Sequence, residues 1–280
     1  MTSLSFTSEH AGLIEISFDA SEGGRATSWR VDGVELLCTH GTDPVEHGMY
    51  VMAPWAGRLE SNSLEYDDAR VELPPTYGPW ALHGVVMYRP VSDPVITITA
   101  DYSKAVFTCE LIGWPWPGQV QTTWVLDSEG LRTEIEVSTP SAFPAILGWH
   151  PWFRRELAGG ALASWHAPGA QRAVREGDFA TGELQPLADS NGPFDDAFYV
   201  PAQSVLLRWE GWGSMTIQNS HPWFVVFDEL PDALCIEPQT NVPNAMNTPV
   251  VDPCEIVRSD QPLRMVTRWR IERDRDTDGR

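Results

Sequence analysis

The segment QVQTTWVLDSEGLRTEIEVS at residues 119–138 is the most regular stretch of the chain, and it decides the fold class. Between residues 131 and 138, apolar or β-branched side chains alternate one by one with charged or polar side chains. A period of two is typical of a β-strand with one buried face. Residues 119–127 form a second candidate strand, and the three residues between them, Ser128 to Gly130, predict a turn with glycine at a position of positive φ. The segment therefore predicts an antiparallel hairpin.

Further hairpins are predicted along the chain, at residues 95–102 with 105–112, 205–210 with 215–219, and 223–227 with 233–237. The 23 prolines and 22 glycines are spread along the 280 residues, which suits many turns and edge strands. Stretches that approach helical amphipathicity are interrupted by proline. We therefore expect an all-β fold, a large antiparallel β-sandwich with little helix. One domain is expected over residues 1–271, followed by a charged and polar C-terminal tail at residues 272–280.

The charge balance excludes two classes of partner. Lysine and arginine number 19 against 39 acidic residues, a net charge of −20, which repels nucleic acid backbones and anionic lipid surfaces. The N-terminus lacks a basic region followed by an apolar stretch, and no run of about 18 consecutive apolar residues occurs.

The four cysteines have neither Cys-x-x-Cys spacing nor the density of a disulfide scaffold. We expect a soluble cytoplasmic protein with reduced thiols, either a monomer or a homodimer.

Two polar residues stand in turn-like contexts early in the chain. Arg58 lies in PWAGRL at residues 54–59, where a guanidinium can reach the oxygens of a ligand or can hold the loop together. His83 lies in LHG at residues 82–84, where the following glycine allows close approach. Either residue could instead be structural.

A histidine between tryptophans is a stronger signal. His150 lies in GWHPWF at residues 148–153 and places a proton carrier among flat apolar faces. Pyranose rings pack their C–H faces on indole, while their hydroxyls need fixed donors and acceptors. We therefore expect Trp149, Trp152 and Trp55 to contact a sugar. His221 repeats the HPWF motif and could border the site, but a structural role is favoured.

Acidic residues complete the set of candidates. Glu237 ends an apolar strand before Pro238, at a position where pocket residues often lie, and Asp195 and Asp196 stand between two phenylalanines. A carboxylate with histidines and an arginine can move protons on a neutral, oxygen-rich substrate, so the small-molecule substrate we expect is a sugar. Residue spacings typical of metal ligands, phosphate-binding loops or a nucleophile elbow do not occur. We expect neither a metal nor a cofactor.

These segments, taken in order, resemble the aldose 1-epimerase (galactose mutarotase) family over nearly the whole chain. The quoted pieces are AGRL, LHG, GWHPWF, DDAF and IEPQT, the last at residues 236–240. The resemblance implies a large antiparallel β-sandwich of the galactose mutarotase-like supersandwich type, with an open sugar cleft on one sheet. It also implies cofactor-independent interconversion of the α and β anomers of free aldoses.

The resemblance implies a role for each matched residue. Glu237 corresponds to the catalytic base, His150 to the general acid and His83 to a second histidine near the ring oxygen. Arg58 corresponds to a substrate-orienting cation, and one of the two aspartates, with Asp196 favoured, to a residue that binds hydroxyls. The mechanism leads us to expect the acid and the base to face each other across a gap one pyranose wide, each favouring the other's charged form. Gly57 stands where many members have asparagine, which leaves the identity of the sugar open.

Two other functions fit parts of the pattern. A non-catalytic carbohydrate-binding protein would use the aromatic residues and Asp196, and a glycosidase would pair Glu237 with Asp196. An anionic sugar would need an additional cation, which Arg25, Arg89 or Arg154 could supply.

Overall fold

Two large antiparallel sheets form the body of the protein in the computed structural model, which describes residues 2–157, 160, 162–187 and 192–274. The larger sheet has eleven strands, in the order β1 (Thr2–Ser8), β2 (Gly12–Asp19), β3 (Arg25–Val31), β5 (Met49–Met52), β13 (Gly148–Arg154), β21 (Ala233–Gln239), β20 (Trp223–Phe227), β17 (Asp195–Tyr199), β15 (Gln171–Glu176) and β16 (Phe179–Pro186), with β4 (Val34–Glu35) beside β3. The second sheet has eight, in the order β14 (Ala163–His166), β18 (Ser204–Trp209), β19 (Gly213–Asn219), β23 (Leu263–Arg273), β11 (Gly130–Ser138), β10 (Gln119–Asp127), β9 (Tyr102–Glu110) and β8 (Val95–Ile98).

Short elements complete the described part of the chain. Two small two-stranded sheets pair β12 (Phe143–Ala145) with β22 (Glu255–Val257) and β6 (Ser63–Tyr66) with β7 (Ala69–Glu72). The helical elements are three 3₁₀ turns, η1 (Pro44–Glu46), η2 (Glu60–Asn62) and η3 (Val86–Tyr88). The all-β sandwich expected from the sequence is thus confirmed. No helix in the described ranges is both long enough and apolar enough to span a bilayer.

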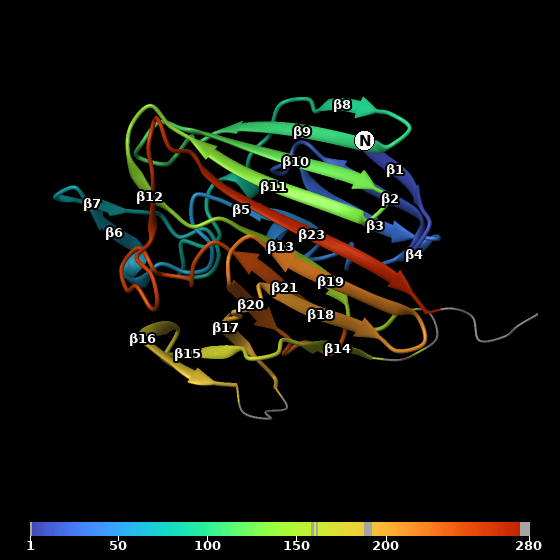
Figure 1. The fold of residues 1–280 in the computed structure, drawn as a ribbon. Helices are drawn as coiled ribbons and strands as arrows, with labels where there is room; N and C mark the ends of the chain where they lie inside the picture. Colours follow the sequence, from blue (N-terminus) through green and yellow to red (C-terminus); the bar gives the residue numbers. More distant parts are fainter. Residues whose placement is uncertain (1, 158–159, 161, 188–191, 275–280) are drawn as a thin grey trace, which may run out of the picture.

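The four predicted hairpins are all present, and Figure 1 shows three of them in the eight-stranded sheet. The turn between β10 and β11 is tighter than expected, because Asp127 pairs with Gly130 and only two residues lie between them. Gly130 has a φ of 124°, and a β-carbon there would lie 2.5 Å from the carbonyl oxygen of Trp269 on β23. Both the positive φ and the close neighbouring strand require glycine at this position.

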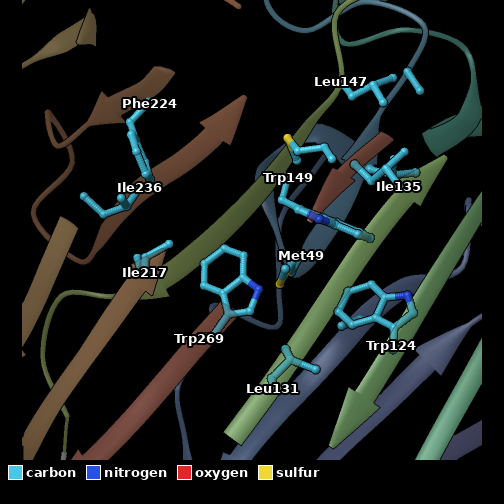
Figure 2. Close-up of a cluster of buried hydrophobic side chains, with 14 of the residues drawn as sticks. Met49, Trp124, Leu131, Ile135, Leu147, Trp149, Ile217, Phe224, Ile236 and Trp269 are labelled. Atoms are coloured by element: carbon cyan, nitrogen blue, oxygen red, sulfur yellow. The ribbon is translucent and has the colours of Figure 1, made fainter. Parts of the chain in front are cut away.

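The sandwich core lies between the two sheets and is rich in indole rings (Figure 2). Trp124 of β10 meets Trp149 of β13 edge to face, with ring centroids 4.6 Å apart. Trp269 of β23 is fully buried, and its Nε1 donates a hydrogen bond to the hydroxyl of Thr133 at 3.0 Å. Large aromatic side chains that bury most of their surface contribute strongly to the stability of such a core.

The outer face of the eleven-stranded sheet carries a second cluster of buried side chains. Successive residues of a strand point to opposite faces, so Trp149 and Phe153 enter the core while Trp152 joins the outer cluster. On β21 the same alternation places Ile236 in the core and Cys235 on the outer face. Connecting segments cover part of this outer face, and the rest is open to a cleft.

The C-terminal boundary differs slightly from the expectation. Glu272 and Arg273, which the sequence placed in a tail, continue β23, and Arg273 Nε donates to the carbonyl of Trp212 at 3.1 Å. The pairing of β23 with β19 extends to this point, which explains the ordered backbone. Residues 275–280 of the expected tail lie outside the described residues.

Candidate active site

A cleft of about 620 Å³ opens on the outer face of the eleven-stranded sheet. Seven of the residues predicted from the sequence line it: Arg58, His83, His150, Trp152, Asp195, Asp196 and Glu237. They come from three strands and two loops, so only the sheet topology brings them together. A concave site with converging polar groups is the usual form of a small-molecule site.

His150 and Glu237 lie in direct contact on neighbouring strands. The register that pairs Gly148 with Gln239 and Trp152 with Cys235 places His150 opposite Glu237, and His150 Nε2 lies 3.3 Å from Glu237 Oε1. The sequence led us to expect a gap one pyranose wide between them, and that expectation is wrong. Because both side chains belong to one wall of the cleft, a ligand in the cleft would lie over the pair rather than between its members.

The His150 ring stacks on two aromatic rings. Its centroid lies 4.8 Å from that of Tyr50 and 5.2 Å from that of Trp152, with interplanar angles of 21° and 26°. The Tyr50 hydroxyl and Trp152 Nε1 both donate to the carbonyl oxygen of Val45, at 3.0 and 2.7 Å. Sequence reasoning missed Tyr50, which lies two residues before Met52 and belongs with it to the outer cluster.

The turn that contains Val45 is itself held in place. Asp43 caps η1 through the backbone N–H of Val45 at 3.0 Å, and a reciprocal contact from Glu46 completes a capping box. Arg25, fully buried, donates to the carbonyl oxygens of Pro44 and His47, the latter at 2.8 Å. The Arg25 guanidinium also lies over the Tyr50 ring, 5.0 Å from its centroid. This arginine, one of three considered for an anionic substrate, is therefore a structural brace.

His83 is held as a hydrogen-bond donor toward the cleft. Its φ is 58°, and the backbone N–H of Gly57 donates to His83 Nδ1 at 3.1 Å. Only an unprotonated ring nitrogen can accept this hydrogen bond, so in the neutral ring we assign the proton to Nε2. Burial lowers the pKa of His83 well below 6.5, and the neighbouring His150, whose ring centroid is 4.9 Å away, lowers it further.

Burial also dominates the electrostatics of the acid and the base. It lowers the pKa of His150 to about 3, with a smaller contribution from the charge of Arg25. Burial raises the pKa of Glu237 well above 4.5, as does Asp195, while the hydrogen bond from Gln239 and the charge of Arg58 oppose this. Burial thus shifts the pKa values of both groups toward their neutral forms, opposite to the direction expected from the pairing of their charges.

The two neighbouring aspartates have different partners. Asp195 shares its strand face with Ala197, which faces the cleft, and its Oδ2 lies 3.5 Å from Arg58 Nη1. Asp196 is almost fully buried, and Arg172 and Arg175 hold its two oxygens at 3.1 and 2.9 Å.

Two of the predicted tryptophans do not reach the cleft. Trp149 points into the core against Trp124 (Figure 2), because it is one residue from His150 on the strand. Trp55 is also buried in the core, where it stacks on Trp114 at 5.5 Å and donates to the carbonyl of Ala81. The prediction that these two indoles contact a ligand is wrong, and of the three only Trp152 lines the cleft.

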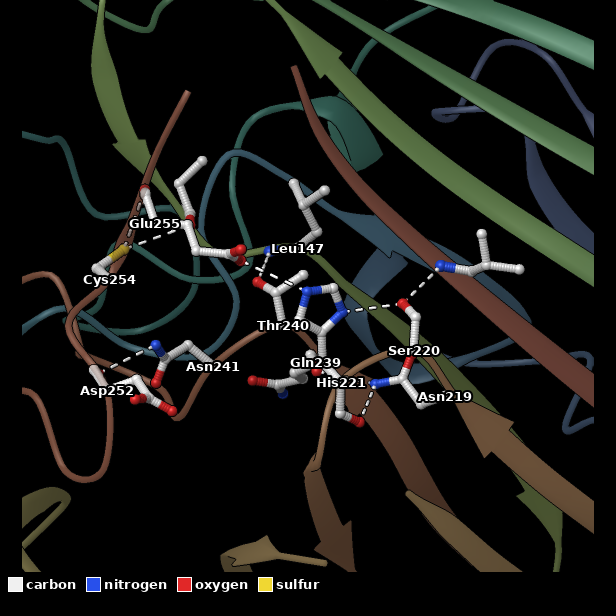
Figure 3. A network of polar contacts seen from close by, with 12 residues as sticks. Leu147, Asn219, Ser220, His221, Gln239, Thr240, Asn241, Asp252, Cys254 and Glu255 are labelled. Atoms are coloured by element: carbon white, nitrogen blue, oxygen red, sulfur yellow. Dashed lines mark hydrogen bonds and ion pairs between the residues drawn. The ribbon is translucent and has the colours of Figure 1, made fainter. Parts of the chain in front are cut away.

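His221 belongs to a separate polar network, shown in Figure 3. Its Nδ1 lies 2.9 Å from the Ser220 hydroxyl and its Nε2 lies 3.6 Å from Glu255. It is not among the described residues that line the cleft. These contacts agree with the structural role that the sequence favoured.

The sequence model of the aldose 1-epimerase family matches residues 6–268. The chain belongs to the aldose 1-epimerase family. A mutarotase-like function on carbohydrates, carried out by an isomerase type of enzyme, follows from this membership.

Solved structures share the fold of this chain. A galactose mutarotase-like protein from Clostridium acetobutylicum aligns with a TM-score of 0.83 and 16% identity, over 97% of this chain and 95% of its own. A GalM/aldose epimerase homologue from C. elegans has a TM-score of 0.77 and 14% identity, over 97% and 99%. A galactose 1-epimerase from Lactobacillus acidophilus has a TM-score of 0.72 and 13% identity, over 97% and 98%. No curated protein matches the chain by sequence.

Proposed function

We propose that this protein interconverts the α and β anomers of a neutral free aldose, with Glu237 as the base and His150 as the acid. The observation that carries the proposal is the 3.3 Å contact between His150 Nε2 and Glu237 Oε1 on the wall of the cleft. A base and an acid this close can act on two neighbouring oxygens of one ring carbon, the C1 hydroxyl and the ring oxygen.

The proton balance of the reaction fits this pair. The Glu237 carboxylate takes the proton of the C1 hydroxyl while the His150 imidazolium gives a proton to the ring oxygen, and the C1 to ring-oxygen bond breaks. The pair is then neutral, the form that burial favours for both groups. Rotation about C1–C2 exposes the other carbonyl face, and reclosure returns both protons. Each positioned group typically contributes about 10²–10⁴ in rate.

Neighbouring groups support binding of the sugar. His83, with its proton assigned to Nε2, supplies a neutral donor beside His150. Asp195 and Arg58 present a carboxylate and a guanidinium to the hydroxyls. We favour Asp195 over Asp196 for this role, because both oxygens of Asp196 already face arginines.

The charges of the cleft favour a neutral substrate. The arginines among its described lining residues, Arg58 and Arg175, each lie beside an aspartate. Arg89 and Arg154, considered above for an anionic sugar, do not belong to that lining. The acidic lining residues are Glu46, Asp178, Asp195, Asp196, Asp232 and Glu237. A phosphate or sulfonate would therefore meet negative potential without a free cation.

Polarimetry on freshly dissolved α-glucose and α-galactose tests the proposal. We expect the protein to accelerate the approach to anomeric equilibrium. A carbohydrate-binding protein would bind the sugar without changing this rate, and a glycosidase would release reducing sugar from aryl glycosides. Absence of acceleration across a panel of neutral aldoses would refute the proposal.

A further inference from the structure

Cys235 adds a third potential metal ligand to the His150–Glu237 pair. The Cys235 sulfur, a ring nitrogen of His150 and a carboxylate oxygen of Glu237 all lie within 4.8 Å of one another, and all three residues are buried. Cys235 and Glu237 are two positions apart on β21, so they share a face, and the sheet register brings His150 across to them. Proton transfer to and from a sugar makes no use of this thiol.

The three donor types select a particular class of ion. Thiolate, imidazole and carboxylate together suit Zn²⁺, whereas Mg²⁺ and Ca²⁺ prefer ligand sets made of oxygen. Tetrahedral Zn²⁺ with its usual bond lengths places such donor atoms roughly 3.3–3.8 Å apart. The donor atoms of His150 and Glu237 already have this spacing, at 3.3 Å. All three donor atoms lie within 4.8 Å of one another, so only a small adjustment of side chains would bring the thiol to the same spacing.

Two of the ligands are oriented by surrounding groups, as in known metal sites. Gln239 Nε2 donates to Glu237 Oε2 at 3.2 Å, which leaves Oε1 turned toward His150. Tyr50 and Trp152 stack on the His150 ring and limit its rotation. His150 and Glu237 line the cleft, so an ion held by them would keep a coordination position open to water or a sugar.

We propose that His150, Cys235 and Glu237 bind Zn²⁺ and that the bound ion inhibits the enzyme. The thiol gives up its proton when the ion binds. Inhibition follows because the ion occupies His150 Nε2 and a Glu237 oxygen, the two atoms that would exchange protons with the sugar. The inhibition rests on the proposed function, whereas the binding does not.

The binding is tested with metal-free protein titrated with Co²⁺ alone, followed by Zn²⁺. A cobalt–thiolate bond produces a charge-transfer absorption in the near ultraviolet, and we expect Zn²⁺ to abolish it by displacement. The variants Cys235→Ala and Cys235→Ser should lose this band and bind Zn²⁺ at least about tenfold more weakly in calorimetry, since losing one good ligand costs more than about 1.4 kcal/mol. Cys254→Ala, which removes a thiol elsewhere in the chain, is the matched control and should keep both.

The inhibition is tested by comparing each protein with and without Zn²⁺ in the polarimetric assay. The zinc concentration that halves the rate should rise at least about tenfold in the folded Cys235 variants relative to Cys254→Ala. A wild-type protein without the thiolate band, or a Cys235→Ala protein that keeps it, overturns the site. Full activity of the zinc-bound wild type overturns the inhibition. A protein without any mutarotase activity refutes the proposed function, while the cobalt band still reports on the site.

Discussion

At the scale of single residues, one cross-strand pair carries the proposed chemistry. His150 and Glu237 are both nearly inaccessible to solvent, yet their side chains form part of the cleft wall. Desolvation strengthens the interactions that such groups make with a bound substrate, and it also shifts their proton affinities. The chemistry thus depends on two side chains at one register position of the sheet.

Removing either member of the pair should abolish most catalysis. We expect Glu237→Gln and His150→Asn each to slow polarimetric anomer exchange by about 10²–10⁴-fold, with the fold retained in circular dichroism. Because the two act as a unit, the double variant should be no slower than the slower single variant. His221→Asn, in the second HPWF motif but outside the cleft, is the control and should change the rate by less than about twofold. Near-normal rates in either active-site variant would contradict the assignment.

His83 should make folding stability depend on pH. Its folded pKa lies below its unfolded value of about 6.5, so the unfolded chain binds more protons and stability falls as the pH drops below 6.5. In His83→Asn, asparagine tolerates the positive φ and its Oδ1 can accept the Gly57 N–H. The variant should therefore lose less stability between pH 6.5 and 5, by up to about 1.4 kcal/mol per pH unit. Urea unfolding at several pH values measures this. An equal change of the unfolding free energy with pH in the wild type and in His83→Asn would contradict the prediction.

At the scale of elements, the turn η1 is joined to the two aromatic rings that stack on His150. Its Val45 carbonyl receives hydrogen bonds from both residues whose rings stack on His150, and Arg25 donates to the carbonyls of Pro44 and His47. Val45 and Glu46 also line the cleft, so the same turn borders the proposed site. The turn η1 therefore helps to hold the two rings between which His150 lies.

Loosening this link should affect the rate more than binding. Tyr50→Phe keeps the ring stacked on His150 but removes the donor to Val45, and Tyr50 does not line the cleft. A hydrogen bond contributes about 0.5–1.5 kcal/mol, so we expect kcat to fall roughly two- to tenfold with KM unchanged. Tyr199→Phe, on another strand of the same sheet, should leave kcat unchanged. An increase in KM alone would argue against a positioning role for Tyr50.

The tight turn before β11 should tolerate only glycine. Gly130→Ala introduces a β-carbon 2.5 Å from a backbone oxygen of β23, so we expect the free energy of unfolding to fall by at least about 2 kcal/mol. Gly211→Ala, in the turn between β18 and β19, has a φ of 79° but no atom within 4 Å of the added carbon. Its cost should be about 1 kcal/mol. Urea unfolding compares the two, and equal losses would show that the close contact with β23 does not matter.

At the scale of the whole molecule, the net charge and the cleft act in the same direction. The chain carries a net charge of −20, and the described cleft lining is rich in carboxylates. Both features lower the local concentration of anions near the cleft compared with that of neutral or cationic solutes. The electrostatic field of the molecule therefore disfavours anionic ligands in the cleft.

Substrate charge should accordingly decide the rate. We expect kcat/KM for glucose 6-phosphate to be at least about tenfold below that for glucose. Added salt screens the negative field, so the difference between the two kcat/KM values should become smaller at high ionic strength. Polarimetry at low and high ionic strength measures both. A preference for the phosphorylated sugar would show that a cation beyond Arg58 and Arg175 reaches the substrate.

The fold class could be predicted from the sequence because it depends on local patterns. Residues 119–138 carry their period of two in side chains a few positions apart, and the hairpins that follow from such patterns are all present. The motifs around Arg58, His83, His150 and Glu237 likewise identified cleft residues, because each is a short segment with an unusual composition.

Tertiary structure alone decided which member of each motif faces the cleft. A shift of one residue reverses the face of a strand, so Trp152 reaches the cleft while Trp149 enters the core, and a composition rich in tryptophan cannot distinguish them. The contacts between His150, Cys235 and Glu237 and the bracing of η1 by Arg25 join segments far apart in the chain. Such contacts depend on the order and register of strands, which are set by the packing of the whole sandwich and not by any local pattern.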